Sequence, residues 1–301
     1  MSDYVVIGCN GQIGYELSQL LSADGDVLSL DRAQLDLLRP MDIERVITKS
    51  RPRVVINAAA YTAVDRAQSE QGAAHAVNAE APRVMADTCA MIGAAFVHYS
   101  TDYVFDGEGT RPYLPTDTPG PVSVYGATKL AGELAVQASG AKAIILRTAW
   151  VYSLRGRNFV LAILRQAAKK PELRVVRDQI GCPTWARSAA RATRDMLRNA
   201  LVQDERGWNF GGKEGIYHVT CSGQTNWFEF ARKIVALAPL PAKPAITPVQ
   251  TSEFPTAARR PKYSVMDCSL TERTFNTRMQ PWEEAITEAM REFTLSILEP
   301  L

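Results

Sequence analysis

The sequence predicts an α/β protein built on a doubly wound parallel sheet, with a smaller α/β domain toward the C-terminus. A short apolar run, YVVI at 4–7, leads into a glycine-rich turn, and an amphipathic stretch follows the turn. Further apolar runs at 26–30, 53–57, 94–100 and 142–152 alternate with segments of helical periodicity. Strands separated by helices are typical of a parallel sheet with helices on both faces.

The turn after the first run has glycines at 8, 11 and 14, between a predicted strand and a predicted helix. Glycine lets the backbone approach a pyrophosphate, and a helix N-terminus offers unpaired N–H groups. A glycine turn without a ligand is the alternative, but the context favours a dinucleotide site. The residues expected to form it are Gly8, Asn10, Gly11, Gln12, Ile13 and Gly14.

The end of the second run bears on the choice of cofactor. Asp31 lies about 17 residues beyond the last glycine, close to the distance at which a carboxylate reads the ribose of NADH. Arg32 beside it can pair with the 2′-phosphate of NADPH instead. The two signals conflict, so NADPH or NADH is expected.

Small and polar residues follow the next two runs. Ala58, Ala59 and Ala60 come after the third and would let backbone approach a cofactor, although alanines pack in cores as often. Ser100-Thr101-Asp102-Tyr103 follows the fourth, at the strand end where open α/β sheets bind ligands. His75 and His98 have no partner at metal-ligand spacing, so packing or surface roles are expected for them.

Tyr125 and Lys129 are four residues apart in a segment expected to begin a helix near Ser123. Residues at this spacing share one helix face, so phenol and ammonium can lie in one pocket. A cation beside a phenol lowers its pKa, and such a tyrosine can give a proton to a substrate oxygen. A surface pair is the alternative. The loop before this helix, 106–123, is long and rich in Gly and Pro, which favours a functional lid.

Beyond 150 the pattern is less regular. We expect a dinucleotide-binding domain over 1–150, with a returning strand near 172–182, and a mainly substrate-binding domain over 151–301. A long helix is expected over about 70–91 and a last one over about 281–297.

Composition excludes several classes of protein. The 301 residues are 46% hydrophobic and 22% charged with net charge +2 and no basic block, so no nucleic-acid partner is expected. No apolar run approaches the roughly 20 residues of a membrane span, and the start lacks a signal peptide. Five widely spaced cysteines suit reduced thiols in a cytoplasm, and no metal site is expected.

The motifs GxxGxxG, STDYVF, YGATK and RTAWVY, in this order, resemble the extended short-chain dehydrogenase/reductases. More narrowly, NAAAYTAVD, HYSTDYVFDG, DQIGCPT and PTAARRP resemble the dTDP-4-dehydrorhamnose reductase family, over nearly the whole chain. The resemblance implies an NAD(P)H-dependent oxidoreductase that reduces the 4-keto group of dTDP-4-dehydro-6-deoxy-L-mannose, a dTDP-keto-sugar substrate, to dTDP-L-rhamnose. Alternatives are another nucleotide-sugar 4-ketoreductase, or a non-catalytic dinucleotide-binding regulatory subunit of methionine adenosyltransferase.

The resemblance also assigns roles to residues. Tyr125 would protonate the developing alkoxide, Thr101 would hydrogen-bond the same oxygen with Ser100 as a partial substitute, and Lys129 would hold the nicotinamide ribose. Asp36 and Leu37 would lie near the adenine. The implied substrate pocket is Thr101, Asp102, Tyr103, Tyr125, Trp150, Asn158 and Arg260, where packing is an equal alternative for Trp150.

One departure concerns metal and assembly. Some family members pair two subunits around magnesium through three glutamates, and Glu16 and Glu292 match two of these positions. Arg187 stands at the third, and an arginine cannot ligate Mg²⁺. It can instead pair with Glu16 or Glu292, with an exposed arginine as the alternative. We therefore expect no magnesium requirement and a monomer or weak homodimer.

Overall fold

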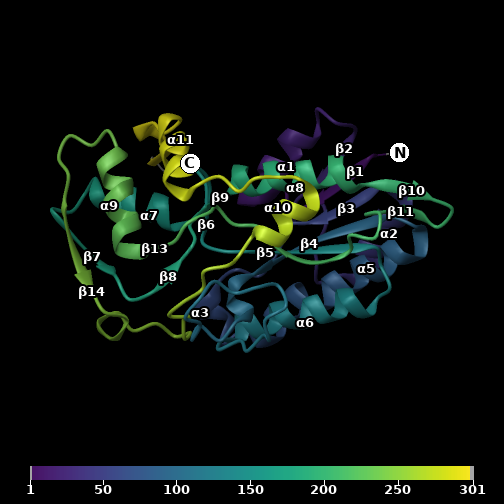
Figure 1. The fold of residues 1–301 in the computed structure, drawn as a ribbon, viewed down its shortest axis with the longest axis horizontal. Coiled ribbons are helices and arrows are strands. Elements are labelled where there is room, and N and C mark those ends of the chain that lie inside the picture. Colours follow the sequence, from purple (N-terminus) through teal and green to yellow (C-terminus); the bar gives the residue numbers. More distant parts are fainter. Residues whose placement is uncertain (1, 299–301) are drawn as a thin grey trace.

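The computed structural model describes residues 2–298, and its centre is a six-stranded sheet (Figure 1). From edge to edge its strands are β12 (Gly215–His218), β5 (Ala143–Thr148), β4 (Ala95–Thr101), β3 (Val54–Asn57), β1 (Tyr4–Ile7) and β2 (Val27–Leu30). Every neighbouring pair is parallel, which confirms the predicted doubly wound sheet. The strand order reverses between β1 and β3, the switch point at which such sheets bind ligands.

Helices bury both faces of this sheet. One face packs against α1 (Gln12–Leu21), α8 (Ala186–Ala200) and α10 (Ser269–Phe275). The other packs against α2 (Pro40–Ser50), α5 (Ala81–Ile92) and α6 (Val124–Ala138). Figure 1 shows α1, α8 and α10 on one side of the strands and α5 and α6 on the other. The strands therefore read as continuous apolar runs, because alternate side chains enter two different cores.

The second lobe is a separate apolar core, in the left half of Figure 1. It is built from α7 (Phe159–Ala167), α9 (Trp227–Leu237), α11 (Trp282–Arg291) and the parallel pair β7 (Glu172–Val176) and β14 (Ala245–Val249). The main sheet includes β12 and is covered by α8 and α10, so the second half of the chain contributes to both lobes.

The strand expected to return to the main sheet near 172–182 does not do so. Strand β7 pairs with β14, and β8 (Ile180–Gly181) pairs with β13 (Thr225–Asn226). The returning strand is β12, which pairs with β5. The reason is visible in burial, since Glu172 and Arg174 are exposed while Leu173 and Val175 are buried. An alternating strand suits a small sheet with one solvated face, not a sheet covered on both.

Short elements complete the fold. They are α3 (Val64–Ala67), α4 (Gln71–His75), η1 (Ala76–Glu80), η2 (Asp102–Val104), β6 (Val151–Tyr152), β9 (Thr184–Trp185), β10 (Val202–Asp204), β11 (Gly207–Asn209), η3 (Thr251–Glu253) and η4 (Leu295–Leu298). The helix expected over 70–91 is α4, the π-helical turn η1 and α5 in succession. The helix expected over 281–297 ends at Arg291. Within residues 2–298, no helix combines the length and apolar character needed to cross a membrane.

Candidate active site

The glycine turn after β1 is built by close backbone approaches. Gly8 has φ +89°, and a Cβ there would lie 2.8 Å from the backbone nitrogen of Ala59. A Cβ on Gly14 would lie 2.2 Å from the Gly8 carbonyl oxygen, so helix α1 needs glycine there to pack on the turn. Helix α1 has neither a side-chain cap nor an acidic residue in its first turn. Its first N–H groups, from Gln12 onward, suit an anion such as a pyrophosphate.

The residues expected to choose the cofactor lie beside this turn. Asp31 Oδ2 accepts a hydrogen bond of 2.8 Å from Asn10 Nδ2. Its Oδ1 accepts from the backbone N–H groups of the turn that follows, which fixes the carboxylate. Arg32 is exposed. Asp36 accepts from the backbone N–H of Leu38, and Leu37 is partly buried against the core below α2.

The small residues after β3 form the opposite wall. Ala58 N–H donates to the Ile7 carbonyl oxygen at 3.0 Å, which ties this segment to β1. The side chain of Asn78, on η1, accepts from Tyr61 N–H at 2.8 Å and donates to Thr128 on α6 at 3.1 Å. The segment 58–61 is therefore held between the glycine turn and the helix that carries Tyr125 and Lys129.

Helix α6 begins where the sequence predicts, with Ser123 Oγ accepting from Gly126 N–H at 3.2 Å. A Cβ on Gly126 would lie 2.1 Å from the Tyr103 carbonyl oxygen, so the first turn of α6 packs directly on η2. The Tyr103 and Tyr125 rings meet edge to face at 5.5 Å. The structure thus brings Tyr125 together with the strand end that carries Thr101, Asp102 and Tyr103.

The predicted effect of Lys129 on Tyr125 is wrong for this structure. Burial raises the pKa of Tyr125 to about 12, and the Thr101 side chain opposes the rise. Lys129 Nζ instead donates to the Tyr99 carbonyl oxygen at 2.6 Å and lies 3.3 Å from His98 Nε2. Burial lowers the pKa of Lys129 itself to about 8, against a raising effect of Glu133. Tyr125 and Lys129 both belong to the first turns of α6, but the Lys129 nitrogen is bound to residues of strand β4 and not to the Tyr125 hydroxyl.

Thr101 and Asp102 end strand β4 in the interior. Thr101 Oγ1 donates to Asp102 Oδ1 at 3.0 Å and accepts from Tyr103 N–H at 3.2 Å. Asp102 is 2% exposed, and within residues 2–298 its Oδ2 has no hydrogen-bond partner. Burial raises the pKa of Asp102 to about 6, while the side chains of Ser264 and Thr101 oppose the rise. Ser100 Oγ likewise has no partner in the described chain, so Thr101 is the hydroxyl tied into the site.

Trp150 lies at the end of β5 with φ +48°, where the chain turns into β6. Its ring stacks on that of Trp227 at a centroid distance of 3.5 Å and covers Gly181, where a Cβ would lie 2.5 Å from the indole. Trp227 in turn packs against Phe159. Trp150 therefore packs against the second lobe, which agrees with the packing interpretation. It also lies just beyond the C-terminal end of β5, where the pocket interpretation requires it to be.

Asn158 and Arg260 occupy different positions. Asn158 Oδ1 caps α7 by accepting from Leu161 N–H at 3.0 Å, and its Nδ2 donates to Gln12 Oε1 at 2.9 Å. Asn158 thus connects the second lobe to the glycine turn. Arg260 forms a fork to Asp65 with hydrogen bonds of 2.9 and 2.7 Å, and lies close enough to Tyr103 to affect its pKa. Arg260 therefore lies near Tyr103, with its guanidinium engaged by the Asp65 carboxylate.

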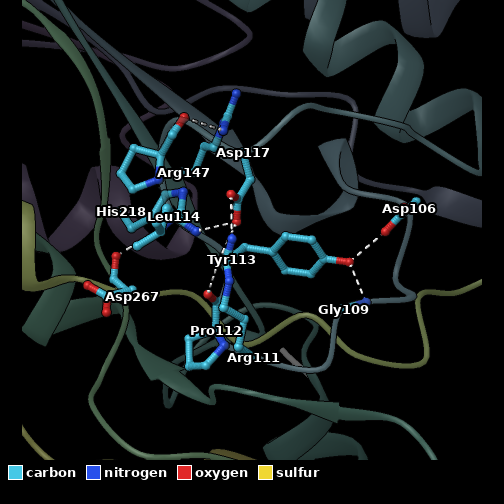
Figure 2. A network of polar contacts seen from close by, with 11 residues as sticks. Asp106, Gly109, Arg111, Pro112, Tyr113, Leu114, Asp117, Arg147, His218 and Asp267 are labelled. Atoms are coloured by element: carbon cyan, nitrogen blue, oxygen red, sulfur yellow. Dashed lines mark hydrogen bonds and ion pairs between the residues drawn. The ribbon is translucent and has the colours of Figure 1, made fainter.

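The long loop expected to form a lid is anchored rather than free (Figure 2). Tyr113 OH donates to Asp106 Oδ1 at 2.6 Å and accepts from Gly109 N–H at 2.8 Å. The Tyr113 backbone bonds on both sides, to Val265 and Asp267. The loop therefore fixes the segment 260–267, and with it Arg260.

Arg187 has the pairing expected of it. Its Nε donates to Glu16 Oε2 at 2.8 Å, and its Nη1 donates to Glu292 Oε1. The guanidinium also lies over the Trp185 ring, 4.7 Å from its centroid. Arg187 thus joins α1, α8 and the end of α11.

Sequence reasoning missed two groups. His98 is fully buried, as the packing alternative expected, but its contacts with Asn57 and Lys129 were not predicted. Arg155 stacks over the Tyr15 ring of α1, 3.4 Å from its centroid, and opposes the rise that burial causes in the pKa of Cys9 in the glycine turn. A histidine inside a buried parallel strand was the signal for the first. Arg155 left no signal, because only the packing of two lobes brings it to the turn.

Comparisons with known proteins agree with this geometry. Residues 2–295 match the RmlD substrate binding domain. A dTDP-4-dehydrorhamnose reductase from Burkholderia thailandensis is 44% identical over 295 residues, which cover 96% of this chain and 98% of the relative. The one from Escherichia coli is 36% identical over 296 residues, 96% and 97% of the two chains. A dTDP-4-dehydrorhamnose reductase from Bacillus anthracis, solved in complex with NADP, has a TM-score of 0.89 at 35% identity and covers 97% and 100%.

Proposed function

This chain belongs to the RmlD substrate binding domain family, and from that membership we propose that it is an NAD(P)H-dependent dTDP-4-dehydrorhamnose reductase. It reduces the 4-keto group of dTDP-4-dehydro-6-deoxy-L-mannose and yields dTDP-L-rhamnose. The relatives reported above are reductases, which favours catalysis over a regulatory role. The observation that carries the proposal is the convergence of Thr101, Tyr125 and the glycine turn at one end of the parallel sheet.

The residues of the turn fit a dinucleotide. The Cβ-free approach at Gly8 and the uncapped N-terminus of α1 suit its pyrophosphate, and Asp31 at the end of β2 suits a ribose hydroxyl. Ala58 to Ala60 supply the opposite wall. When bound, the nicotinamide supplies the hydride that reduces the ketone.

Tyr125 is the proton donor in this proposal. Because burial raises its pKa to about 12, the phenol keeps its proton throughout the neutral range, which is the form that an acid needs. Thr101 donates a hydrogen bond to the same substrate oxygen as negative charge develops there. To do so its hydroxyl turns away from Asp102 Oδ1, which it meets at 3.0 Å.

Lys129 holds the nicotinamide ribose. It starts from the site formed by the Tyr99 carbonyl oxygen and His98, one helical turn from Tyr125. Its charge is present below its pKa of about 8, so ribose binding and turnover both depend on pH in that range.

The sugar nucleotide lies across the two lobes. Asp102, Tyr103 and Trp150 shape the sugar end, and Arg260 binds the diphosphate by exchanging its present fork to the Asp65 carboxylate for phosphate oxygens. Asn158 does not contact the substrate in this proposal, because its side chain caps α7 and donates a hydrogen bond to Gln12. We place the enzyme in the cytoplasm, a proposal supported by five free thiols, without nucleic-acid or membrane partners and as a monomer or weak homodimer.

Turnover with a panel of dTDP-keto sugars tests the proposal. Pure protein should oxidise NADPH or NADH with dTDP-4-dehydro-6-deoxy-L-mannose and give dTDP-L-rhamnose. Faster turnover of another keto sugar would move the assignment to a different 4-ketoreductase. No turnover of any of them, with dinucleotide binding intact, would overturn it.

A further inference from the structure

Lys129 lies in a buried polar cluster with two side chains that the proposed reaction does not use. His98 and Asn57 are fully buried, and Lys129 is 1% exposed. Asn57 and His98 are register partners on the parallel strands β3 and β4. Their side chains point to the sheet face covered by α6, where Lys129 enters. Three buried polar side chains in a row must satisfy one another, since no solvent reaches them.

The orientation of the Asn57 amide fixes the first donor. Asn57 Oδ1 accepts from Ala59 N–H at 3.1 Å, so the other amide atom, Nδ2, faces the histidine. That nitrogen lies 3.1 Å from His98 Nδ1. An amide nitrogen only donates, so Nδ1 must be the acceptor and carries no proton.

The tautomer of His98 follows from this assignment. A neutral imidazole with a bare Nδ1 carries its proton on Nε2, and Nε2 lies 3.3 Å from Lys129 Nζ. A neutral amine can accept that proton while donating to the Tyr99 carbonyl oxygen at 2.6 Å. An ammonium has no lone pair and would face the Nε2 proton. The cluster therefore satisfies its donors and acceptors when Lys129 is neutral and opposes its protonation.

We propose that Asn57 and His98 are positioning residues that set the protonation state of Lys129, because Asn57 holds His98 in the tautomer that presents an N–H to the lysine nitrogen. The inference rests on the proposed role of Lys129 in reduction. It adds that charging Lys129 requires the imidazole proton to move to Nδ1 and the Asn57 amide to turn.

The charges around Lys129 agree with this assignment. Glu133 lies one turn further along α6 and raises the Lys129 pKa, but it is neutralised by Arg147 of β5 through hydrogen bonds of 2.9 and 2.6 Å. Burial is the main cause that lowers the pKa of His98 well below its usual range, so the ring is neutral whether or not Lys129 is charged.

Nitrogen-15 NMR of the imidazole rings tests the tautomer directly and needs no substrate. The chain has three histidines, so His98→Phe and the exposed His75→Gln assign the ring signals. The proposal expects a neutral His98 ring protonated on Nε2 at about pH 9.5, well above the Lys129 pKa of about 8, where the lysine is the neutral amine. A ring protonated on Nδ1, or on both nitrogens, at that pH would overturn it even if the protein reduces the keto sugar. If the His98 ring has the expected tautomer but the protein does not reduce the keto sugar, the result counts against the proposed function and not against this inference.

Two variants test the effect on Lys129. His98→Phe removes the N–H that favours the neutral amine and places a ring face near Nζ. It should move the alkaline limb of the kcat/KM profile upward by about one pH unit, a tenfold change in the lysine ionisation constant. Asn57→Asp offers the ring only an acceptor, so it should shift His98 to the Nδ1-protonated tautomer and move the same limb upward. The matched control, His75→Gln, should leave the limb in place. A limb that is unchanged in a folded His98→Phe would refute the proposal.

Discussion

Asp102→Asn should stabilise the protein at neutral pH while impairing reduction. Asp102 is 2% exposed, and its Oδ2 has no partner within residues 2–298. Burial raises its pKa from 3.8 to about 6. A carboxyl group whose pKa is raised by folding stabilises the folded state below its unfolded pKa. That contribution is lost as pH rises through the folded pKa, here between about pH 4 and pH 6.

The magnitude follows from the size of the shift. Two pKa units correspond to about 3 kcal/mol, the cost of the buried charge at pH 7. Asparagine keeps an acceptor for Thr101 Oγ1 but carries no charge. Any packing cost of the substitution is the same at every pH. The difference in unfolding free energy between variant and wild type should therefore grow by about 2 kcal/mol from about pH 4 to about pH 7.5.

Urea denaturation across this pH range measures the difference. Asp106→Asn is the matched control, because a hydrogen bond from Tyr113 lowers the pKa of Asp106. The Asp106→Asn variant should become less stable relative to wild type as pH rises, so its difference in unfolding free energy changes in the opposite direction. An Asp102→Asn difference that is constant with pH would refute the claim of a buried, destabilising carboxylate. Lower turnover in this more stable variant would show that the charge serves the substrate.

Three further predictions concern Lys129, cofactor choice and metal. Since burial lowers the pKa of Lys129 to about 8, wild-type kcat/KM for reduction should fall as pH rises through 8. Lys129→Arg should lack that limb, and a flat wild-type profile to about pH 9.5 would contradict the assignment. Asp31→Ala should shift preference toward NADPH, whereas a wild-type preference above about a thousandfold would mean that Asp31 or Arg32 does not face the ribose. EDTA should leave activity and sedimentation unchanged, because Arg187 already pairs with Glu16 and Glu292. Turnover restored specifically by Mg²⁺, or a dimer lost on chelation, would contradict this.

The sequence was most informative where spacing determines geometry. Gly8 and Gly14 have the backbone roles that the motif predicts, and Ser123 caps the helix that carries Tyr125. Arg187 joins Glu16 and Glu292 as the replaced carboxylate suggested. The π-helical turn at Asn78, which links the segment after β3 to α6, was not foreseen.

What the sequence could not give depends on long-range pairing. Strands β7 and β12 are both short, and long-range pairing with β14 and with β5 determines which of the two joins the main sheet. The four-residue spacing of Tyr125 and Lys129 does not say where the ammonium points, and a carbonyl oxygen and an imidazole of β4 decide that. Asn158 could have been read as a helix cap, because it directly precedes the helical run at 159–167.

Paired binding and turnover of Tyr125→Phe test the central claim most directly. The phenylalanine ring still packs against Tyr103 but has no proton to donate. We expect a loss of about 10²–10⁴-fold in kcat for dTDP-4-dehydro-6-deoxy-L-mannose, with the Kd for NADPH nearly unchanged. Near-normal turnover in Tyr125→Phe would contradict the assignment of Tyr125 as the acid, and with it the account of this site.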